Sequence, residues 1–218
     1  MSKDYGQFCG LAKAASVLGE RWALLVARDL SVASLRFTDL HQGLPGIPTS
    51  LLTTRLRELE AAGVVERQVA AQPGRGAVYA LTAYGKELQP ALDALGRWGA
   101  QRMSTPEPDD VVTDGSLAAA LRTAYKPTRS IAATYQVHAG PATAWATVEG
   151  RDVVVGTGQP TTTPDLIIRS GPQLRLLLAG RLSPHEALDS GEIDIEGSKA
   201  AFEAFASAFH VPLDNLAL

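Results

Sequence analysis

The amino-acid sequence predicts an α+β protein of two domains. The first hundred residues combine helical periodicity with one short pair of strands, and the last hundred place several strands among helices. A segment with two prolines separates these parts. A length of 218 residues with 45% hydrophobic content is enough for two cores. We expect domains at residues 1–103 and 116–218, joined by a linker over 104–115.

The first domain is expected to begin with helices. The first helix should pack under the elements that follow it, through Val17, Leu18, Trp22, Leu25 and Val26. A short helical segment over residues 37–42 precedes a break over 43–46 that contains two glycines and a proline. A longer helix follows the break, and Gly63 is expected to end it. This order predicts a helix-turn-helix.

The longer helix is predicted to have two unlike faces. Leu52, Leu56 and Leu59 fall at i, i+4 and i+7, so they should face the core. The opposite face carries no bulky apolar side chain and consists of Ser50, Thr54, Arg57 and Ala61, with Thr53 at its margin. Hydroxyls can bond phosphates or base edges and arginine can fork onto guanine, so this face suits a DNA major groove. The alternative is a polar face that meets only water.

A β-hairpin is expected directly behind the helix-turn-helix. Residues 64–69 and 77–81 are short runs with β-branched and aromatic content, and Pro73 and two glycines lie between them. Arg75 stands at the tip, where it could reach a phosphate or a minor groove. The alternative is an arginine in a solvated loop. A helix-turn-helix with a basic hairpin favours DNA binding more than either feature alone.

A long helix is predicted after the hairpin. Thr82 is the expected N-cap, and the apolar residues at spacings of three and four are Tyr84, Leu88, Leu92, Leu95 and Trp98. Pairing of this helix with its twofold mate, together with the N-terminal segment, would form a dimer interface. The alternative is packing of the helix onto the C-terminal domain of its own chain.

The second domain is expected to place helices over one face of an antiparallel sheet. A helix is marked by Leu117, Leu121 and Ala124, and a half-buried strand by alternating residues from Ile131 to Val137. Strands are predicted at 143–149, 151–156, 165–168 and around Ile193 and Ile195, with helices at Leu174–Leu178, after the capping box at residues 183–186, and at Phe202–Phe209.

The N-terminal part resembles the HxlR-type winged helix-turn-helix transcriptional regulators of bacteria. The matching pieces are Cys9, LGERWALLVARDL (18–30), RFTDL (36–40), LPGI (44–47), LLTTRLRELEAAGVV (51–65) and VYALTAYGKEL (78–88). The resemblance implies a dimer that inserts the helix over 49–62 into a major groove of an inverted-repeat operator. It also implies DNA-facing or phosphate-facing positions for Thr49, Ser50, Thr53, Thr54, Arg55, Arg57 and Arg75. The chain departs from the family at Pro48-Thr49-Ser50, where members often carry serine, proline and lysine.

The C-terminal part resembles the sterol carrier protein type-2 domain. The resemblance spans roughly residues 116–212, and its most specific pieces are AGRLSPHEAL (179–188) and SGEIDIEG (190–197). Such domains enclose an apolar tunnel for lipids and carry out no catalysis. The implied wall of a ligand pocket consists of Trp145, Val155, Ile167, Leu174, Leu177, Leu178, Phe202, Phe205 and Phe209. The alternative for each of these residues is an ordinary core position.

Composition and motifs narrow the function classes further. Residues 1–103 carry 12 basic and 9 acidic side chains, whereas 104–218 carry 8 and 14, so the mildly basic half is the one expected to bind DNA. No apolar run is long enough for a membrane span and no signal peptide is recognisable, which predicts a cytoplasmic protein. The sequence has no metal-ligand spacing, cofactor motif or nucleophile signature, so we expect neither cofactor, metal nor enzymatic activity.

Cys9 is the single cysteine, which excludes an internal disulfide. In several HxlR-type regulators a cysteine at this position senses oxidants or electrophiles, so the resemblance makes Cys9 a candidate redox sensor. The alternative is a partly buried small apolar residue.

The sequence therefore predicts a dimeric transcriptional regulator whose C-terminal domain responds to a hydrophobic small molecule or lipid. Two alternatives remain open. One is a lipid-binding or carrier protein that uses the helix-turn-helix only for dimerisation. The other is a redox-sensing regulator that acts through Cys9.

Overall fold

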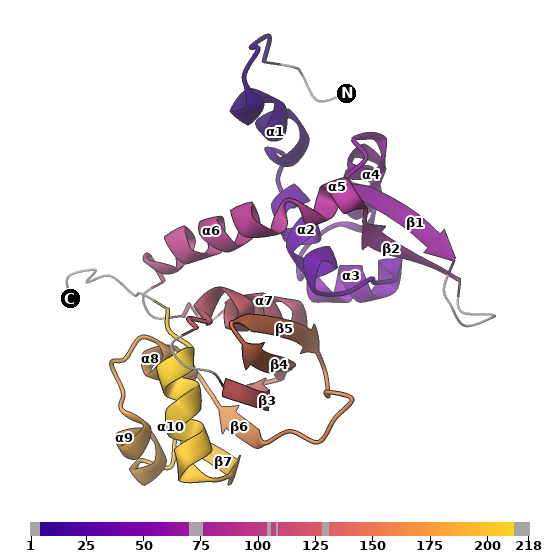
Figure 1. Cartoon of the computed structure of the whole chain (residues 1–218). Helices are drawn as coiled ribbons and strands as arrows, with labels where there is room; N and C mark the ends of the chain where they lie inside the picture. The colour runs from indigo at the N-terminus through magenta and orange to yellow at the C-terminus, as the bar shows by residue number, and fades with distance from the viewer. Residues whose placement is uncertain (1–4, 70–75, 104–105, 108, 128–130, 212–218) are drawn as a thin grey trace. The chain divides into compact units, whose positions relative to one another are not determined.

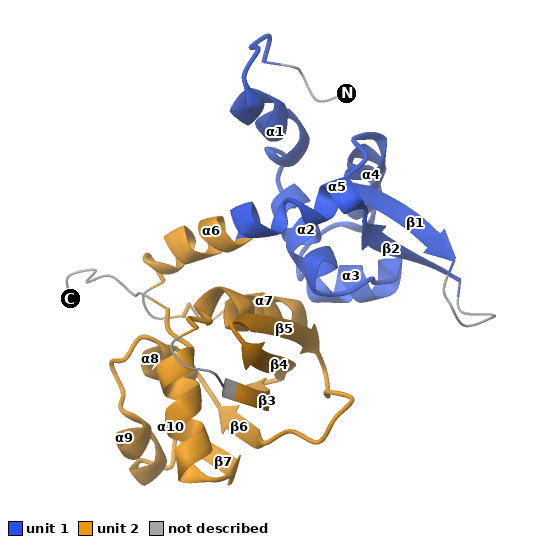
Figure 2. Cartoon of the chain, viewed as in Figure 1, with its two compact units in different colours: residues 1–92 blue, residues 93–218 orange. Residues whose placement is uncertain are grey.

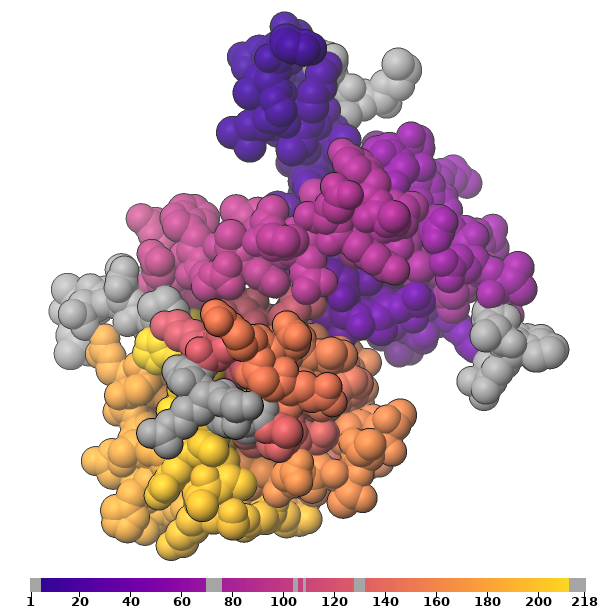
Figure 3. Space-filling model, in the orientation of Figure 1, coloured from indigo at the N-terminus to yellow at the C-terminus, as the bar shows by residue number. Residues whose placement is uncertain are grey.

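The computed structural model describes residues 5–69, 76–103, 106–107, 109–127 and 131–211 (Figure 1). The chain forms two compact units, residues 1–92 and 93–218 (Figure 2), whose surfaces are drawn in Figure 3. The units divide inside helix α6 (Gln89–Ala100), ahead of the predicted linker. The domain limits at 103 and 116 stay predictions. No helix among the described residues is long and apolar enough to cross a bilayer.

The first unit contains the predicted helix-turn-helix and hairpin. It comprises α1 (Gly10–Leu18), α2 (Ala23–Val32), α3 (Phe37–Gly43), α4 (Thr49–Ala61), β1 (Val65–Val69), β2 (Ala77–Leu81) and α5 (Ala83–Lys86). Strands β1 and β2 are antiparallel, with Val65 opposite Leu81. Gly63, at a φ of 70°, follows the end of α4 as predicted. The core joins Leu52, Leu56 and Leu59 of α4 to apolar residues of α2, α3 and the hairpin.

The first predicted helix is in fact two helices. Helix α1 ends at Leu18, where the amide of Gly19 closes onto the carbonyl of Ala15. A turn follows, and Trp22 takes a left-handed backbone conformation with a φ of 78°. This conformation is unfavourable for an aromatic residue, so contacts around the turn must hold it.

The long helix expected after the hairpin is also interrupted. Thr82 caps α5 as predicted, because its hydroxyl accepts a hydrogen bond from the amide of Gly85 at 3.0 Å. Helix α5 ends at Lys86, and α6 begins at Gln89. Pro90 explains the break, because proline has no N–H for the carbonyl of Lys86 and its ring clashes with that carbonyl in a continuous helix.

Gly85 allows α5 to approach the start of the hairpin closely. A Cβ at this position would lie 2.1 Å from the carbonyl oxygen of Val64. We therefore expect Gly85→Ala to destabilise the unit by about 1–3 kcal/mol, because the backbone contact must open. Thermal unfolding followed by circular dichroism measures the change. Gly99→Ala is the matched control, since nothing lies within 4 Å of a Cβ there, and equal melting temperatures for the two variants would contradict the prediction.

The second unit is a five-stranded sheet with helices. Its elements after α6 are α7 (Asp114–Ala124), β3 (Ile131–Ala139), β4 (Ala142–Gly150), β5 (Asp152–Thr157), β6 (Leu166–Ser170), α8 (Gln173–Leu178), α9 (Pro184–Asp189), β7 (Ile193–Gly197) and α10 (Lys199–Ala208). The strand order is β5-β4-β3-β6-β7. The capping box at Ser183 and Glu186 is present as predicted.

The sheet differs from the prediction in two respects. It is mixed rather than antiparallel, because β3 and β6 run parallel, with Tyr135 opposite Leu166. Strand β3 is also buried on both faces in its middle, since Thr134 and Gln136 are buried as well as Tyr135 and Val137. Burial of both faces depends on what packs above and below the sheet, and the alternation of polar and apolar residues does not reveal it.

Within the second unit, one face of α6 packs on α7. The carboxylate of Asp93 accepts hydrogen bonds from the guanidinium of Arg122, with the closest oxygen 2.9 Å from Nη2. One turn further, a Cβ on Gly96 would lie 3.6 Å from Thr123. Another face of α6 exposes Leu95 and Trp98. The helix therefore packs on its own chain and still presents an apolar surface.

Candidate nucleic-acid interface

The polar face of α4 lies on the surface of the first unit. Leu52, Leu56 and Leu59 are at most 1% exposed, which confirms the predicted core face. Ser50, Thr54, Arg57 and Ala61 are exposed and Thr53 is half-buried, as the helical projection predicts. A surface of hydroxyls and one arginine is thereby available to a large partner, with its helix anchored by leucines beneath it.

The threonine hydroxyls on this face are already oriented by the helix. Thr53 donates its hydroxyl hydrogen to the carbonyl of Thr49 at 2.9 Å, and Thr54 donates to the carbonyl of Ser50 at 3.0 Å. Each hydroxyl in this state keeps its lone pairs, so it can accept a hydrogen bond from a base amino group. Ser50 and Arg57 are therefore the better donors toward phosphate oxygens.

Arg55 occupies a different position from the DNA-facing one that the family resemblance implied. It is only 9% exposed. Its Nε donates to the carbonyl of Arg21 at 3.1 Å, and its Nη2 pairs with the carboxylate of Glu20 at 3.1 Å. Its Nη1 pairs with Glu58 on the same helix. The guanidinium is thus occupied within the unit, where it ties α4 to the turn that precedes α2.

This tie explains how the left-handed Trp22 is held. Glu20 and Arg21 are the two residues before Trp22, and Arg55 contacts both of them. The guanidinium of Arg21 also lies over the Trp22 ring, 5.4 Å from its centroid. Arg55 is therefore a positioning residue that connects the candidate reading helix to the scaffold.

Arg75 and Thr49 are two further residues of the predicted interface. Arg75 lies outside the described residues, so its place at the tip of the hairpin stays a prediction. Thr49 is exposed at the first position of α4, after the N-cap Pro48, whose ring offers no side-chain cap. The hydroxyl of Thr49 instead lies 3.3 Å from Nε2 of His41 in α3. Sequence reasoning missed His41, because its spacing suggested only that it was not a metal ligand.

The first unit also contains a buried carboxyl group. Asp29 of α2 is 2% exposed, and its Oδ1 accepts a hydrogen bond from Nε of Arg28 at 2.8 Å. Its Oδ2 is buried without a hydrogen-bond partner among the described residues. Burial raises the pKa of Asp29 above its ordinary value, and the charge and hydrogen bond of Arg28 offset only part of this rise.

The raised pKa of Asp29 has a consequence for stability. Because the unfolded chain releases this proton more easily than the folded chain, stability contributed by Asp29 falls as the pH rises from the unfolded pKa to the folded pKa. We expect Asp29→Asn to remove this loss, so the variant gains stability relative to wild type across that pH range. Urea unfolding at a series of pH values measures the difference. Glu60→Gln is the control, and a stability difference independent of pH would contradict the prediction.

The candidate ligand wall in the second unit does not form one cluster. Trp145 and Ile167 are both register partners of Gln136, whereas Val155 pairs with Ala146 on the face of Tyr135. These side chains therefore lie on opposite faces of the sheet. The remaining candidates, namely Leu174, Leu177, Leu178, Phe202, Phe205 and Phe209, are buried.

The phenylalanines form a packed aromatic cluster with Tyr135. The rings of Phe205 and Phe209 stack with centroids 4.6 Å apart, and both meet Tyr135 edge-on at 5.2 and 5.6 Å. Such spacing is that of a filled core. A ligand could enter between these rings only if they separated. The spacing of apolar residues along the sequence does not indicate how closely these rings pack.

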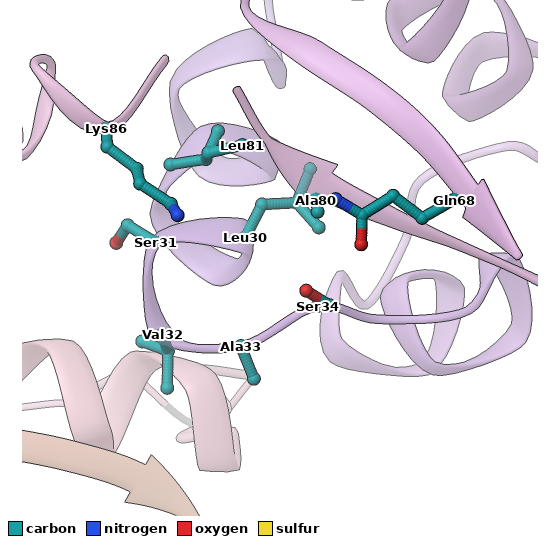
Figure 4. Close-up of a pocket in the computed structure, with 9 residues that line it drawn as sticks. All are labelled: Leu30, Ser31, Val32, Ala33, Ser34, Gln68, Ala80, Leu81 and Lys86. Carbon is teal, nitrogen blue, oxygen red and sulfur yellow. The ribbon is translucent and has the colours of Figure 1, made fainter. Parts of the chain in front are cut away.

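A shallow hollow of about 290 Å³ lies in the first unit. Figure 4 shows it between the end of α2, the hairpin and α5, with the side chain of Lys86 extending toward Ser31. Leu30, Ala80 and Leu81 in its lining are almost wholly buried, whereas Val32 and Ala33 are partly exposed.

Cys9 is exposed at the N-cap of α1. Its carbonyl accepts a hydrogen bond from the amide of Lys13 at 3.0 Å. The alternative of a partly buried apolar residue does not describe this position. The described residues contain no group of three or more histidine, cysteine, aspartate or glutamate side chains that could hold a metal ion.

The fold of the first unit is that of winged helix-turn-helix regulators, and comparison with known proteins identifies the family. The profile of the HxlR-like helix-turn-helix family matches residues 17–107. An uncharacterised HTH-type transcriptional regulator of Synechocystis is 37% identical over 96 residues, which are 44% of this chain and 71% of the relative. The chain belongs to the HxlR-like helix-turn-helix family through its N-terminal part.

A second relative agrees with this assignment. The HTH-type transcriptional regulator YodB of Bacillus subtilis is 34% identical over 48% of this chain and 90% of its own length. The solved structure of the reduced form of YodB is 31% identical and covers 46% of this chain and all of that one, with a TM-score of 0.40. The family match stops at residue 107, so the resemblance of the C-terminal unit to a sterol carrier protein domain stays a prediction.

Proposed function

We propose that this protein is a transcriptional regulator that binds an inverted-repeat DNA operator as a dimer. Helix α4 is the reading helix, and the hairpin of β1 and β2 is the wing. The observation that carries the proposal is the exposed face of Ser50, Thr54 and Arg57 on a helix whose other face is anchored by leucines. Membership of a family whose relatives are named transcriptional regulators supports it.

Selection of genomic DNA fragments by the purified full-length protein tests this proposal. We expect enrichment of a short inverted repeat whose half-sites are one helical turn apart, about 34–36 Å from centre to centre. Affinity should fall steeply with salt, because phosphate contacts release counterions. Uniform recovery of all fragments would reject specific recognition. A carrier protein that uses this fold only to dimerise would recover no DNA above background.

We propose that exposed apolar side chains form the dimer interface. In the first unit Phe8 is exposed ahead of α1 and Leu11 on it, and in the second unit Leu95 and Trp98 are exposed on α6. Large exposed apolar residues commonly mark interfaces. We expect a dimer by analytical ultracentrifugation and a monomer for the double variant Leu95→Glu, Trp98→Glu. Val154→Glu, at another exposed apolar position, is the control and should remain dimeric. A dimeric double variant would place the interface elsewhere.

We further propose that the second unit modulates DNA binding in response to a hydrophobic small molecule. The resemblance of residues 116–212 to the sterol carrier protein type-2 domain supports it. The rings around Tyr135 are closely packed, so a ligand in this layer would have to separate them. A ligand there shifts DNA affinity only if it binds the DNA-competent and incompetent states unequally. Native mass spectrometry of freshly purified protein with added fatty acids tests the binding. Absence of any bound acyl ligand would reject a lipid effector.

A redox response through Cys9 is the competing mechanism. The exposed thiol is the observation that favours it. Oxidant treatment should then change operator affinity in wild type and leave Cys9→Ser unaffected, whereas equal responses of the two proteins would exclude Cys9 as the sensor.

A further inference from the structure

His41 of α3 contacts the first residue of the reading helix from a neighbouring helix. Its Nε2 lies 3.3 Å from the hydroxyl oxygen of Thr49. The His41 ring stacks on Phe37, one turn earlier in α3, with centroids 6.3 Å apart and planes 13° from parallel. Phe37 in turn packs against the core of the unit. The imidazole is therefore held in place, and its position fixes that of the Thr49 hydroxyl.

The hydrogen bond between these residues decides what Thr49 can offer to DNA. When Nε2 of His41 accepts, the single hydroxyl hydrogen of Thr49 is used inside the protein. When Nε2 carries a hydrogen and donates to the hydroxyl oxygen, the hydroxyl hydrogen is free for another acceptor. Phosphate oxygens only accept hydrogen bonds, so Thr49 can donate to a phosphate and keep its hydrogen bond with His41 only when His41 is the donor.

Thr49 differs from the other threonines of α4 in its hydrogen-bond partner. Thr49 is exposed, and Pro48 before it has no side-chain hydroxyl or carboxylate that would compete for the same geometry. Thr53 and Thr54 on the same helix donate to carbonyls of α4 itself. Among the three threonines of this helix, Thr49 is the one whose hydroxyl is paired with a side chain from another helix.

We infer that His41 is a positioning residue for DNA binding, which holds the Thr49 hydroxyl as a donor toward a backbone phosphate of the operator. His41 itself need not touch DNA. This inference rests on the proposed function of α4 as the reading helix. It predicts that His41 and Thr49 act as one unit in operator affinity.

A double-mutant cycle with the full-length protein tests the inference. The probe is the duplex operator obtained by fragment selection, and the dissociation constant is measured by fluorescence anisotropy at fixed salt. We expect His41→Ala and Thr49→Val each to weaken binding about tenfold, because each removes the oriented donor to a charged acceptor. The double variant should be no weaker than the weaker single variant.

Conservative variants separate positioning from general damage to the fold. Glutamine places an amide nitrogen about where His41 has Nε2, whereas asparagine is shorter by one methylene and cannot reach Thr49. We expect His41→Gln to keep operator affinity within about twofold of wild type and His41→Asn to bind like His41→Ala. His185→Ala, at an exposed histidine in α9, is the control, and thermal unfolding should show similar melting temperatures for all His41 variants.

The outcomes distinguish this inference from the proposed function. Wild-type protein that selects no operator would overturn both. Wild-type protein that binds its operator while His41→Ala binds equally well would overturn the role of His41 alone. Losses that simply add in the double variant, or equal binding by the glutamine and asparagine variants, would also reject it.

Discussion

Replacing Arg57 with alanine is expected to weaken operator binding by about tenfold to a hundredfold while leaving the fold intact. Arg57 is exposed on the polar face of α4. A guanidinium that forks onto a guanine or a phosphate contributes about 1–3 kcal/mol to binding. Titration of labelled operator at several salt concentrations measures the loss. A lower salt dependence in the variant would identify a phosphate contact, and an unchanged one with relaxed sequence preference would identify a base contact.

The control for Arg57 is another exposed arginine. Arg151 lies in the turn between β4 and β5 in the second unit, and Arg151→Ala should bind the operator as wild type does. Adding Arg75→Ala to Arg57→Ala should weaken binding further if the hairpin tip also meets DNA. Unchanged operator affinity in the double variant Arg57→Ala, Arg75→Ala would show that the polar face of α4 and the hairpin tip do not bind DNA.

Replacing Arg55 with leucine is expected to act through stability instead. The guanidinium of Arg55 bonds the Arg21 carbonyl and the Glu20 and Glu58 carboxylates, and leucine makes none of these bonds. The carboxylates remain partly exposed, so their loss of a partner is moderate, and we estimate a destabilisation of roughly 1–3 kcal/mol. The strained turn at Trp22 should loosen as well. Thermal and urea unfolding measure the change.

The two arginines give opposite patterns, which makes them controls for each other. Arg57→Ala should lose affinity at an unchanged melting temperature, whereas Arg55→Leu should lose stability first. The stability of Arg55→Lys should lie between that of wild type and that of Arg55→Leu, because lysine keeps the charge without the forked donors. If Arg55→Leu melts as wild type does and binds operator poorly, then Arg55 faces DNA after all and the buried network is unimportant.

Much of the first unit could be predicted from periodicity and turn residues. The spacing of Leu52, Leu56 and Leu59 predicted the buried side of α4, and Gly63 predicted its end, because both depend on geometry within one helix. The same reasoning overlooked the breaks at Gly19 and Pro90. The spacing of apolar residues can continue across a break in a helix. That spacing alone therefore predicts one long helix where the structure has two.

Contacts between side chains from distant segments could not be predicted from the spacing of residues. Arg55 and Arg57 are two positions apart on one helix, so they lie about 200° apart around its axis, and Arg55 is buried while Arg57 is exposed. Spacing does not indicate that Arg55 is paired with Glu20, because this contact arises from the approach of the turn before α2 to that side of α4. His41 and Thr49 likewise meet through the angle between α3 and α4. Local sequence contains no information on these approaches that spacing can extract.

The helix-turn-helix, the hairpin and the polar face of α4 follow from the sequence, because they depend on neighbours within a few positions of one another. Only the folded chain reveals the partners of Arg55, the parallel pairing of β3 with β6, and the position of Trp145 on the face of the sheet opposite to the one that Phe205 contacts. These features depend on contacts between residues far apart in the chain, which form only when packing brings their elements together.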